Sequence, residues 1–377
     1  MKNADLYQLV FRCLIGDKNI IEELKNNVIL NEDNLFRFIH VSSNHFVLPA
    51  IYIRLKNLGL TLYIPDDLNE HLNEICTLNT KRNKEFLQQA DEINQQLAKE
   101  GIEPVYLKGT GNLLDNLYPN PGDRIIGDID FLVREKEFLK TAEAIKQMGY
   151  VTDLKIYDDP KTLKDYPRLT REDVPAALEI HQMPVIPKYA KWFTTEKVFS
   201  EKKQISSQIN CYVPSDKHKL IINFIHSQLS DKRHMLKNIA LRDLYDLYLI
   251  SERASHKEAI QQIKEKRKAQ VYFDFIPQLV SCHENKIPRK ESQIFFKKHQ
   301  WFLNHPEIHK RYSFIIKLNY LLTNRFLKAF VSKSVYKNLA VRVKDRDWWK
   351  DRLLKNKKIK EIISGRESDL KGNDGSK

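Results

Sequence analysis

The middle of this 377-residue chain differs in pattern from both of its flanks. Between Gly101 and Val185, short apolar runs of strand length alternate with stretches whose apolar residues recur with the period of a helix. The strand-like runs are 104–107, 125–133 and 176–185, with an amphipathic helix predicted over 135–148. Strands alternating with helices over about 80 residues predict an α/β core. Because both flanks carry only the helical period, we expect an α+β fold, with a small mixed sheet embedded in helical N- and C-terminal regions.

The flanks show where the helical regions begin and end. The polar stretch 66–99 predicts a long helix, and Gly101 suits its C-terminal cap because glycine adopts the left-handed backbone without strain. Ser215 suits the N-cap of a later helix. We therefore expect a helical N-terminal region, a core, a helical domain, a basic helical region and a disordered tail; the boundaries are 1–100, 101–214, 215–285, 286–364 and 365–377.

Positive charge is concentrated near the end of the chain. The whole chain has 63 Lys and Arg against 49 Asp and Glu, a net charge of +14, and 286–360 alone has 21 against 5, a net of +16. Such a surplus favours polyanionic partners. Three interpretations stay open for 286–360: helices packed on the core with a solvated lysine-rich face, contact with an anionic membrane surface, or contact with RNA or another polyanion.

The cysteines and the apolar runs bound the class of protein. Cys13, Cys76, Cys211 and Cys282 lie far apart, which excludes the Cys-x-x-Cys pairs of zinc ribbons and thioredoxin-like sites. No apolar run approaches the ~20 residues of a transmembrane helix. The N-terminus lacks the apolar core of a signal peptide. We expect a reduced, soluble, cytoplasmic protein with no transmembrane segment.

The first candidate for chemistry is the pair Asp128 and Asp130 in the second strand-like run. Alternate side chains of a strand share a face, so the two carboxylates point the same way while Ile129 and Phe131 point to the other side. Two adjacent carboxylates repel each other unless a cation neutralises them. Hard oxygen ligands at this spacing suit Mg²⁺, with Mn²⁺ as an alternative.

A second pair, Glu179 and His181, shares one face of the later strand. If the two strands are neighbours, three carboxylates converge, as two-metal phosphoryl chemistry requires. Either pair also has an ordinary interpretation, as solvated residues of a strand or, for His181, as a group that orients Glu179.

Upstream, Lys108-Gly109-Thr110-Gly111 follows a strand and opens a helix. Glycines at such a turn let backbone N–H groups approach phosphate oxygens, although the order of residues is not that of a Walker A loop. Arg124 is placed to pair with phosphate oxygens as a bidentate donor. These residues predict a nucleotide site beside the carboxylates.

An ordered set of motifs carries a family resemblance. They are Leu107-Lys108-Gly109, Tyr118-Pro119, Pro121-Gly122, Arg124, Asp128-Ile129-Asp130 and Leu178-Glu179-Ile180-His181, followed by His226 and Arg242-Asp243-Leu244-Tyr245-Asp246. Over roughly residues 80–250 the chain resembles the bacterial "uncharacterised nucleotidyltransferase" family of the DNA polymerase beta-like superfamily. It departs from the superfamily in having Thr110 where serine is usual, and Glu179 where the third carboxylate is usually Asp.

The resemblance implies a nucleotidyltransferase fold and a set of roles. Asp128 and Asp130 would bind two Mg²⁺ ions, and Glu179 would complete the first metal site and act on the acceptor hydroxyl. Gly109 and Thr110 would cradle the triphosphate, with Lys108, Arg124 and His181 as further nucleotide-binding residues. His226, Arg242 and Asp243 are expected mainly to brace the helical domain.

We therefore predict an enzyme that transfers a nucleoside monophosphate from an NTP to a hydroxyl acceptor and releases pyrophosphate. The acceptor is open: a small molecule, an RNA or a protein. Two alternatives remain, namely a non-catalytic nucleotide- or RNA-binding module of the same fold, and a membrane-surface protein acting through 286–360.

Overall fold

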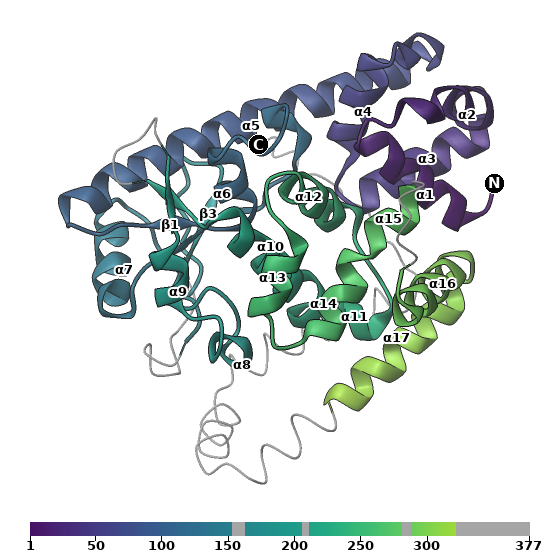
Figure 1. The fold of residues 1–377 in the computed structure, drawn as a ribbon. Helices are drawn as coiled ribbons and strands as arrows, with labels where there is room; N and C mark the ends of the chain where they lie inside the picture. Colours follow the sequence, from purple (N-terminus) through teal and green to yellow (C-terminus); the bar gives the residue numbers. More distant parts are fainter. Residues whose placement is uncertain (153–162, 206–210, 281–287, 322–377) are drawn as a thin grey trace, which may run out of the picture. The chain divides into compact units, whose positions relative to one another are not determined.

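The computed structural model describes residues 1–152, 163–205, 211–280 and 288–321. These residues form a five-stranded mixed sheet in the order β3-β2-β1-β5-β4 (Figure 1). The strands are β1 (Val105–Tyr106), β2 (Asp128–Leu132), β3 (Ala177–His181), β4 (Lys203–Gln204) and β5 (Tyr212–Val213). Strands β2 and β3 are parallel neighbours, whereas β1 and β2 run antiparallel. The predicted α+β class with a small mixed sheet is confirmed.

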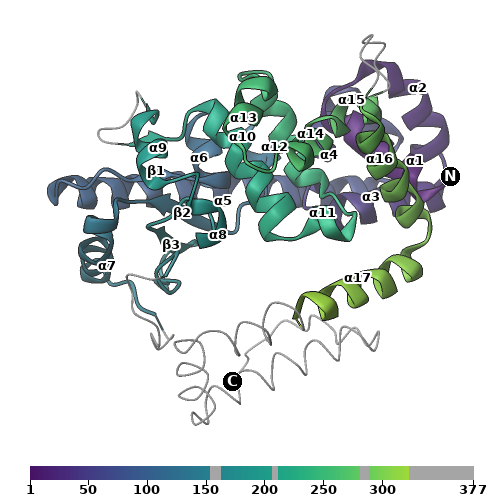
Figure 2. The ribbon, with the colours of Figure 1, turned by 60° about the horizontal axis from the view of Figure 1, so that its bottom comes forward.

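The N-terminal region is helical, as the apolar period predicts. It contains α1 (Asn3–Leu14), α2 (Ile21–Leu24), α3 (Glu32–Asn44), α4 (Leu48–Asn57) and α5 (Asp66–Lys99), with a π-helical turn at Lys25–Ile29. Helix α5 has the predicted bounds, and Gly101 follows it with a φ of 69°. Figures 1 and 2 show α5 running from the N-terminal helices to the sheet, so this one element spans both regions.

Further helices surround the sheet and follow it. Those within the core are α6 (Lys108–Leu114), α7 (Phe138–Gln147), α8 (Pro187–Ala190) and α9 (Thr195–Ser200). Those after it are α10 (Asp216–Phe224), a π-helical turn (Ile225–Ser230), α11 (Arg233–Leu236), α12 (Leu241–Ser251), α13 (His256–Gln262), α14 (Lys266–Phe273), α15 (Phe275–Val280), α16 (Lys290–Asn304) and α17 (Pro306–Leu321). Ser215 caps α10 by accepting a hydrogen bond from the His218 backbone N–H, as predicted.

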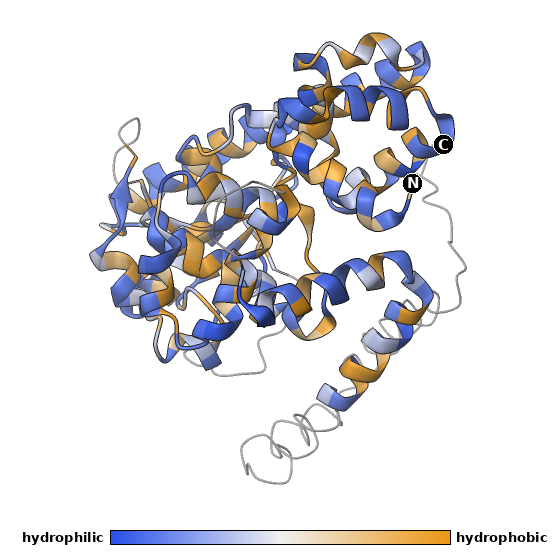
Figure 3. Cartoon of the chain, turned by 45° about the vertical axis from the view of Figure 1, so that its right-hand side comes forward, coloured by the Kyte–Doolittle hydropathy of each residue, from blue (hydrophilic) through white to orange (hydrophobic). Residues whose placement is uncertain are grey.

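Apolar side chains from the N-terminal helices, the sheet and the later helices join in one buried cluster. The cluster includes Tyr7 and Phe11 from α1, Phe131 from β2, and Phe224 and Tyr272 from the later helices. Figure 3 shows hydrophobic and hydrophilic residues alternating along most helices, which is the pattern of elements that bury one face. A shared core of this kind holds the sheet and its flanking helices in fixed relation.

Helix α5 also fixes the sheet through buried amides. Asn83, which has no exposed surface, donates from Nδ2 to the carbonyl oxygens of Pro121 and Arg124 at 2.6 and 2.8 Å. Gln89 donates to the Ala176 carbonyl at 2.7 Å and accepts from the Ala176 N–H at 3.1 Å. These two residues therefore anchor the segments that lead into β2 and β3.

The chain divides into two compact units, Met1–Ser313 and Phe314–Lys377, and the features discussed below lie in the first. None of the helices in the described ranges combines the length and apolarity needed to cross a membrane. Most of the basic segment 286–360 and all of the tail predicted over 365–377 lie outside the described residues.

Candidate active site

The pairing of β2 with β3 brings the predicted carboxylates to one place. In the parallel register, Asp130 lies opposite Glu179, and Asp128 lies opposite Ala177. The predicted condition for convergence, that the two strands are neighbours, is therefore met. Asp128, Asp130 and Glu179 all line one cavity of about 370 Å³ between the sheet and the helices that follow it.

Asp130 is the centre of the cluster. Its Oδ1 lies 2.6 Å from Lys108 Nζ and 2.8 Å from His181 Nε2. Glu179 Oε2 lies 3.8 Å and 3.6 Å from the same two nitrogen atoms. The His181 side chain is completely buried and is not among the residues that line the cavity. It contacts Asp130 directly, and its nucleotide-binding role stays a prediction.

Burial and mutual repulsion separate the pKa values of these groups. Burial, together with the Asp130 carboxylate, raises the pKa of Glu179 to about 7. Burial lowers the pKa of His181 to about 4. Burial opposes the charge on Asp130, but Lys108 and His181 outweigh it and hold its pKa well below the usual range. Asp130 thus carries the permanent negative charge of the cluster.

Asp128 lies in the same cavity but in a different environment. Its Oδ2 is 3.5 Å from Arg168 Nη2, and burial together with Asp130 raises its pKa. Within the described residues, the group of side chains that could share one metal ion consists of Asp130, Glu179 and His181, whose ligand atoms lie within 4.8 Å of one another. Two carboxylates suit a hard divalent ion such as Mg²⁺ or Mn²⁺. The donor set therefore fits one ion, with Asp128 beside it.

The turn into α6 is built for close packing. Lys108 has a φ of 52°, a conformation that costs a residue with a side chain about 1 kcal/mol or more. A Cβ on Gly111 would lie 2.2 Å from the Tyr106 carbonyl oxygen, so only glycine fits there. A Cβ on Gly109 would lie 3.2 Å from Ile126, at the edge of the cavity. The two glycines therefore let α6 approach β1 and the loop before β2.

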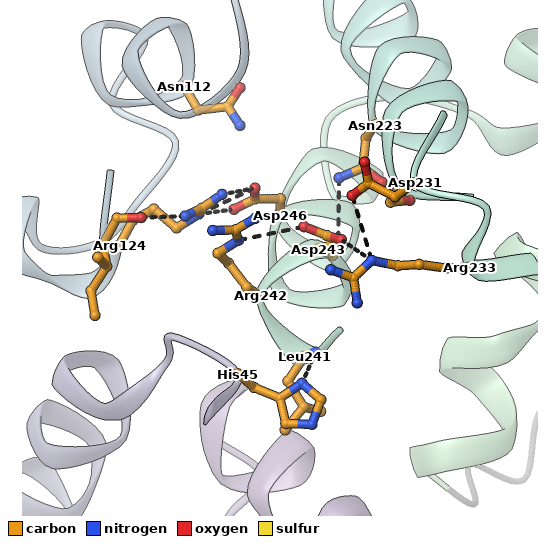
Figure 4. Close-up of polar contacts among 12 residues, drawn as sticks. His45, Asn112, Arg124, Asn223, Asp231, Arg233, Leu241, Arg242, Asp243 and Asp246 are labelled. Atoms are coloured by element: carbon orange, nitrogen blue, oxygen red, sulfur yellow. Dashed lines mark hydrogen bonds and ion pairs between the residues drawn. The ribbon is translucent and has the colours of Figure 1, made fainter. Parts of the chain in front are cut away.

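Two predicted nucleotide-binding residues are engaged with the protein itself. The Thr110 hydroxyl is buried and donates to the Asp128 carbonyl at 3.0 Å. Arg124 donates from Nε and Nη2 to the Asp246 carboxylate at 3.0 and 3.1 Å, as Figure 4 shows. Arg124 lines the cavity, whereas Thr110 does not. The triphosphate-binding roles of both residues stay predictions.

The wall of the cavity opposite the sheet comes from α10, the π-helical turn and α12. It includes Asn223, His226, Arg242 and Asp243. Arg242 Nε lies 3.6 Å from Asp243 Oδ1 and makes no hydrogen bond within the described part of the chain. Arg233 approaches the same carboxylate from its other side, at 3.7 Å (Figure 4). We expected Arg242 mainly to brace the helical domain, yet its Nε lacks a hydrogen-bond partner among the described residues, and its guanidinium lies over the Phe46 ring at 5.4 Å.

Comparison with known proteins adds one positive result to this geometry. A search of curated proteins finds no match to the chain. The model of the family described as "Uncharacterised nucleotidyltransferase" matches residues 31–281, a range that contains the whole sheet and every residue of the cavity. The resemblance inferred from the ordered motifs is therefore confirmed, and so is the general class of enzyme. The chain belongs to the uncharacterised nucleotidyltransferase family.

Proposed function

We propose that this protein is a divalent-metal-dependent enzyme that transfers a nucleoside monophosphate from an NTP to a hydroxyl group of an acceptor. The observation that carries the proposal is the β2–β3 register, which sets Asp130 against Glu179 at a cavity that also contains Lys108 and Arg242. Acidic groups for a metal and cations for a polyphosphate thus share one space. Both are needed to bring a nucleotide and a metal ion together.

In the proposed reaction, the acceptor oxygen forms a bond to the α-phosphorus, and the bond from that phosphorus to the bridging oxygen of the β-phosphate breaks. Pyrophosphate leaves with the electron pair of that bond, and the hydroxyl proton passes to a carboxylate of the cluster, for which Glu179 is the candidate. Mg²⁺ or Mn²⁺ bound at Asp130 and Glu179 would supply positive charge to the phosphate oxygens. Asp128 would complete the set for a second ion.

The cavity walls suggest how the substrates are held. Lys108 and Arg242 lie on different walls, which places positive charge on two sides of a bound triphosphate. Gly109 and Gly127 border the same space and leave room for phosphate oxygens close to the backbone. We expect the acceptor to enter from the solvent side of this cavity; its hydroxyl is the one feature that the proposed chemistry requires.

Calorimetric titration tests the nucleotide site directly. We expect Mg²⁺ complexes of one or more of ATP, GTP, CTP and UTP to bind the full-length protein, and Asp128→Asn/Asp130→Asn to lose that binding. The control is Asp173→Asn, which removes an exposed carboxylate that pairs with Arg171 at 2.7 Å. Equal binding by the wild type and the double variant would contradict the proposed site.

The transfer step is tested with NTP labelled at the α-phosphate, incubated separately with RNA, protein and small-molecule fractions of a cell extract. Label that enters one fraction with stoichiometric pyrophosphate release, and not with the double variant, would support transfer. Metal-dependent NTP binding without label transfer to any fraction would favour the alternative, a binding module of the same fold.

A further inference from the structure

Lys108 contacts one oxygen atom of Asp130 and one of Glu179, the two carboxylates that would hold a metal ion in this cluster. Its Nζ lies 2.6 Å from Asp130 Oδ1 and 3.8 Å from Glu179 Oε2, and its side chain is 23% exposed. Without a cation between them, these two carboxylates would repel each other in a largely buried setting. The ammonium group therefore offsets part of this repulsion in the protein.

We propose that Lys108 is an exchangeable internal cation: its ammonium holds the carboxylate cluster together until a metal ion replaces it, and the released side chain then binds the polyphosphate of the NTP. This inference rests on the proposed function, because it assigns the replaced oxygens to the metal site and the released group to the nucleotide. It goes further by coupling the two ligands through one side chain.

Lys108 and a metal ion compete for the same oxygen atoms. Asp130 Oδ1 already accepts hydrogen bonds from both Lys108 and His181, and Glu179 Oε2 faces the same two nitrogen atoms. A metal ion that is held by these oxygens competes with the ammonium group for them, since two cations close together repel each other. His181 is completely buried in the core of the sheet, whereas Lys108 borders the cavity. Lys108 is therefore the group that yields.

The cavity offers the released side chain a new position. Lys108 is the first residue of α6 and borders the cavity next to Gly109 and Gly127. Its flexible four-carbon chain can turn from the carboxylates towards this space without moving the backbone. In the cavity it would meet the negative charge that accompanies a nucleotide, so the cost of leaving Asp130 for a metal ion is lower when NTP is bound as well. Metal and NTP should therefore bind cooperatively.

Two opposite changes in affinity form the test. In Lys108→Gln, Mn²⁺ without nucleotide should bind about tenfold or more tightly than in the wild type, because no internal cation competes. The same variant should bind Mg²⁺·NTP about tenfold more weakly, because a charged phosphate contact is lost. Mn²⁺ binding is followed by electron paramagnetic resonance of the free ion, and nucleotide binding by calorimetry. Unchanged or weaker Mn²⁺ binding in Lys108→Gln would overturn the proposal.

The matched control is Lys164→Gln. Lys164 also lines the cavity, but its Nζ pairs with Asp165 at 3.6 Å rather than with the cluster. Lys164→Gln removes the same charge from the same cavity as Lys108→Gln does. An equal gain in Mn²⁺ affinity in both variants would therefore show a general effect of charge and refute direct competition. Lys108→Arg, which keeps the charge, should keep the weak Mn²⁺ binding of the wild type.

A measurement on the wild type avoids any effect of substitution on folding. Reductive methylation followed by peptide mass spectrometry reports how accessible each lysine amine is. Lys108 should become more reactive when Mg²⁺ is added and protected again when NTP is added with it, while Lys140, half-exposed on α7, keeps one rate throughout. A methylation rate of Lys108 that does not change when Mg²⁺ is added would contradict the exchange.

Failure of this inference can be told apart from failure of the proposed function. If Asp130→Asn binds Mn²⁺ as the wild type does, the metal site itself is wrong. If Asp130→Asn abolishes Mn²⁺ binding and Lys108→Gln does not change it, the metal site stands and the exchange is refuted.

Discussion

The cations of the cavity differ in what they already bind. Arg124 makes a two-point contact with Asp246, and Lys219 is buried against Asp115. Arg242 is different: its Nε makes one loose ion pair with Asp243 and no hydrogen bond among the described residues, and its guanidinium lies over the Phe46 ring at 5.4 Å. A group whose hydrogen-bonding capacity is unused in the protein is the one best prepared to bind a ligand's phosphate. This difference leads to a prediction about a pair of arginines.

Arg242→Gln should weaken the binding of Mg²⁺·NTP by about tenfold, the equivalent of ~1.4 kcal/mol for one charged hydrogen bond, and should leave the free energy of unfolding nearly unchanged. The matched variant is Arg124→Gln, in which a buried Asp246 carboxylate loses its partner. It should lower the free energy of unfolding by about 3 kcal/mol or more. Calorimetry and urea unfolding measure the two effects. A destabilised Arg242→Gln with unchanged nucleotide binding would instead support a bracing role.

At the level of single residues, sequence patterns selected carboxylates that line one cavity, but they did not rank these candidates. The alternation of a strand correctly paired Asp128 with Asp130. It could not show how the two differ: Asp130 contacts Lys108 and His181, whereas Asp128 faces Arg168. The contact with Arg168 depends on the segment before β3, which folds back and pairs with β3 at Leu169–Leu178 and Asp165–His181. The roles of Thr110 and Arg124 were equally beyond reach, because their partners are a strand carbonyl and a distant helix.

Among the elements, α5 does more than its sequence suggests. Its polar pattern predicted a scaffold helix, and the structure shows that some of its polar residues are buried and face the sheet. Asn79 and Asn83 hold the carbonyl oxygens of the loop that leads to β2, and Gln89 holds the start of β3. Buried amides of this kind are not visible in a single sequence, because an exposed Asn and a buried Asn look alike until the partner is known.

Asn83→Ala should lower the free energy of unfolding by roughly 2–3 kcal/mol, since it removes two buried hydrogen bonds: the Pro121 carbonyl loses its amide donor, and the Arg124 carbonyl keeps only the longer bond from Asn79 at 3.3 Å among the described residues. Asn73→Ala, on an exposed part of the same helix, should change it by less than about 0.5 kcal/mol. Both are measured by urea unfolding at pH 7.5. Similar values for the two variants would show that the amide contacts do not anchor the loop.

Across the whole molecule, two histidines and a tyrosine join regions far apart in sequence. Tyr7 of α1 packs edge-on against the rings of His45 and His299, at 5.4 and 5.1 Å. His45 Nδ1 accepts the Leu241 N–H at 3.2 Å, a contact drawn in Figure 4. Burial lowers the pKa of both histidines to about 4. The folded protein therefore keeps them neutral at a pH where the unfolded chain protonates them.

This arrangement predicts a stability that falls on acidification. Between pH 6.5 and about 4 the unfolded chain binds protons that the folded protein excludes, so the free energy of unfolding decreases as the pH is lowered and is restored above pH 6.5. For the fully buried His299 the loss reaches about 3 kcal/mol at the acidic end. His299→Gln should flatten the decline in urea midpoint between pH 7.5 and 5, and His71→Gln, exposed on α5, should not. An identical decline in all three proteins would refute the assignment.

The anchoring of β2 and β3 by α5 has a consequence for how such an enzyme can be divided or recombined. A fragment that started at Gly101 would contain every side chain of the cavity, but it would lack the amides that fix the approach to both strands. We expect such a fragment to be unable to hold its carboxylates in register. Exchange of catalytic cores between relatives should therefore succeed only when α5 is exchanged together with the sheet. The segment that must be kept intact is longer than the stretch that carries the motifs.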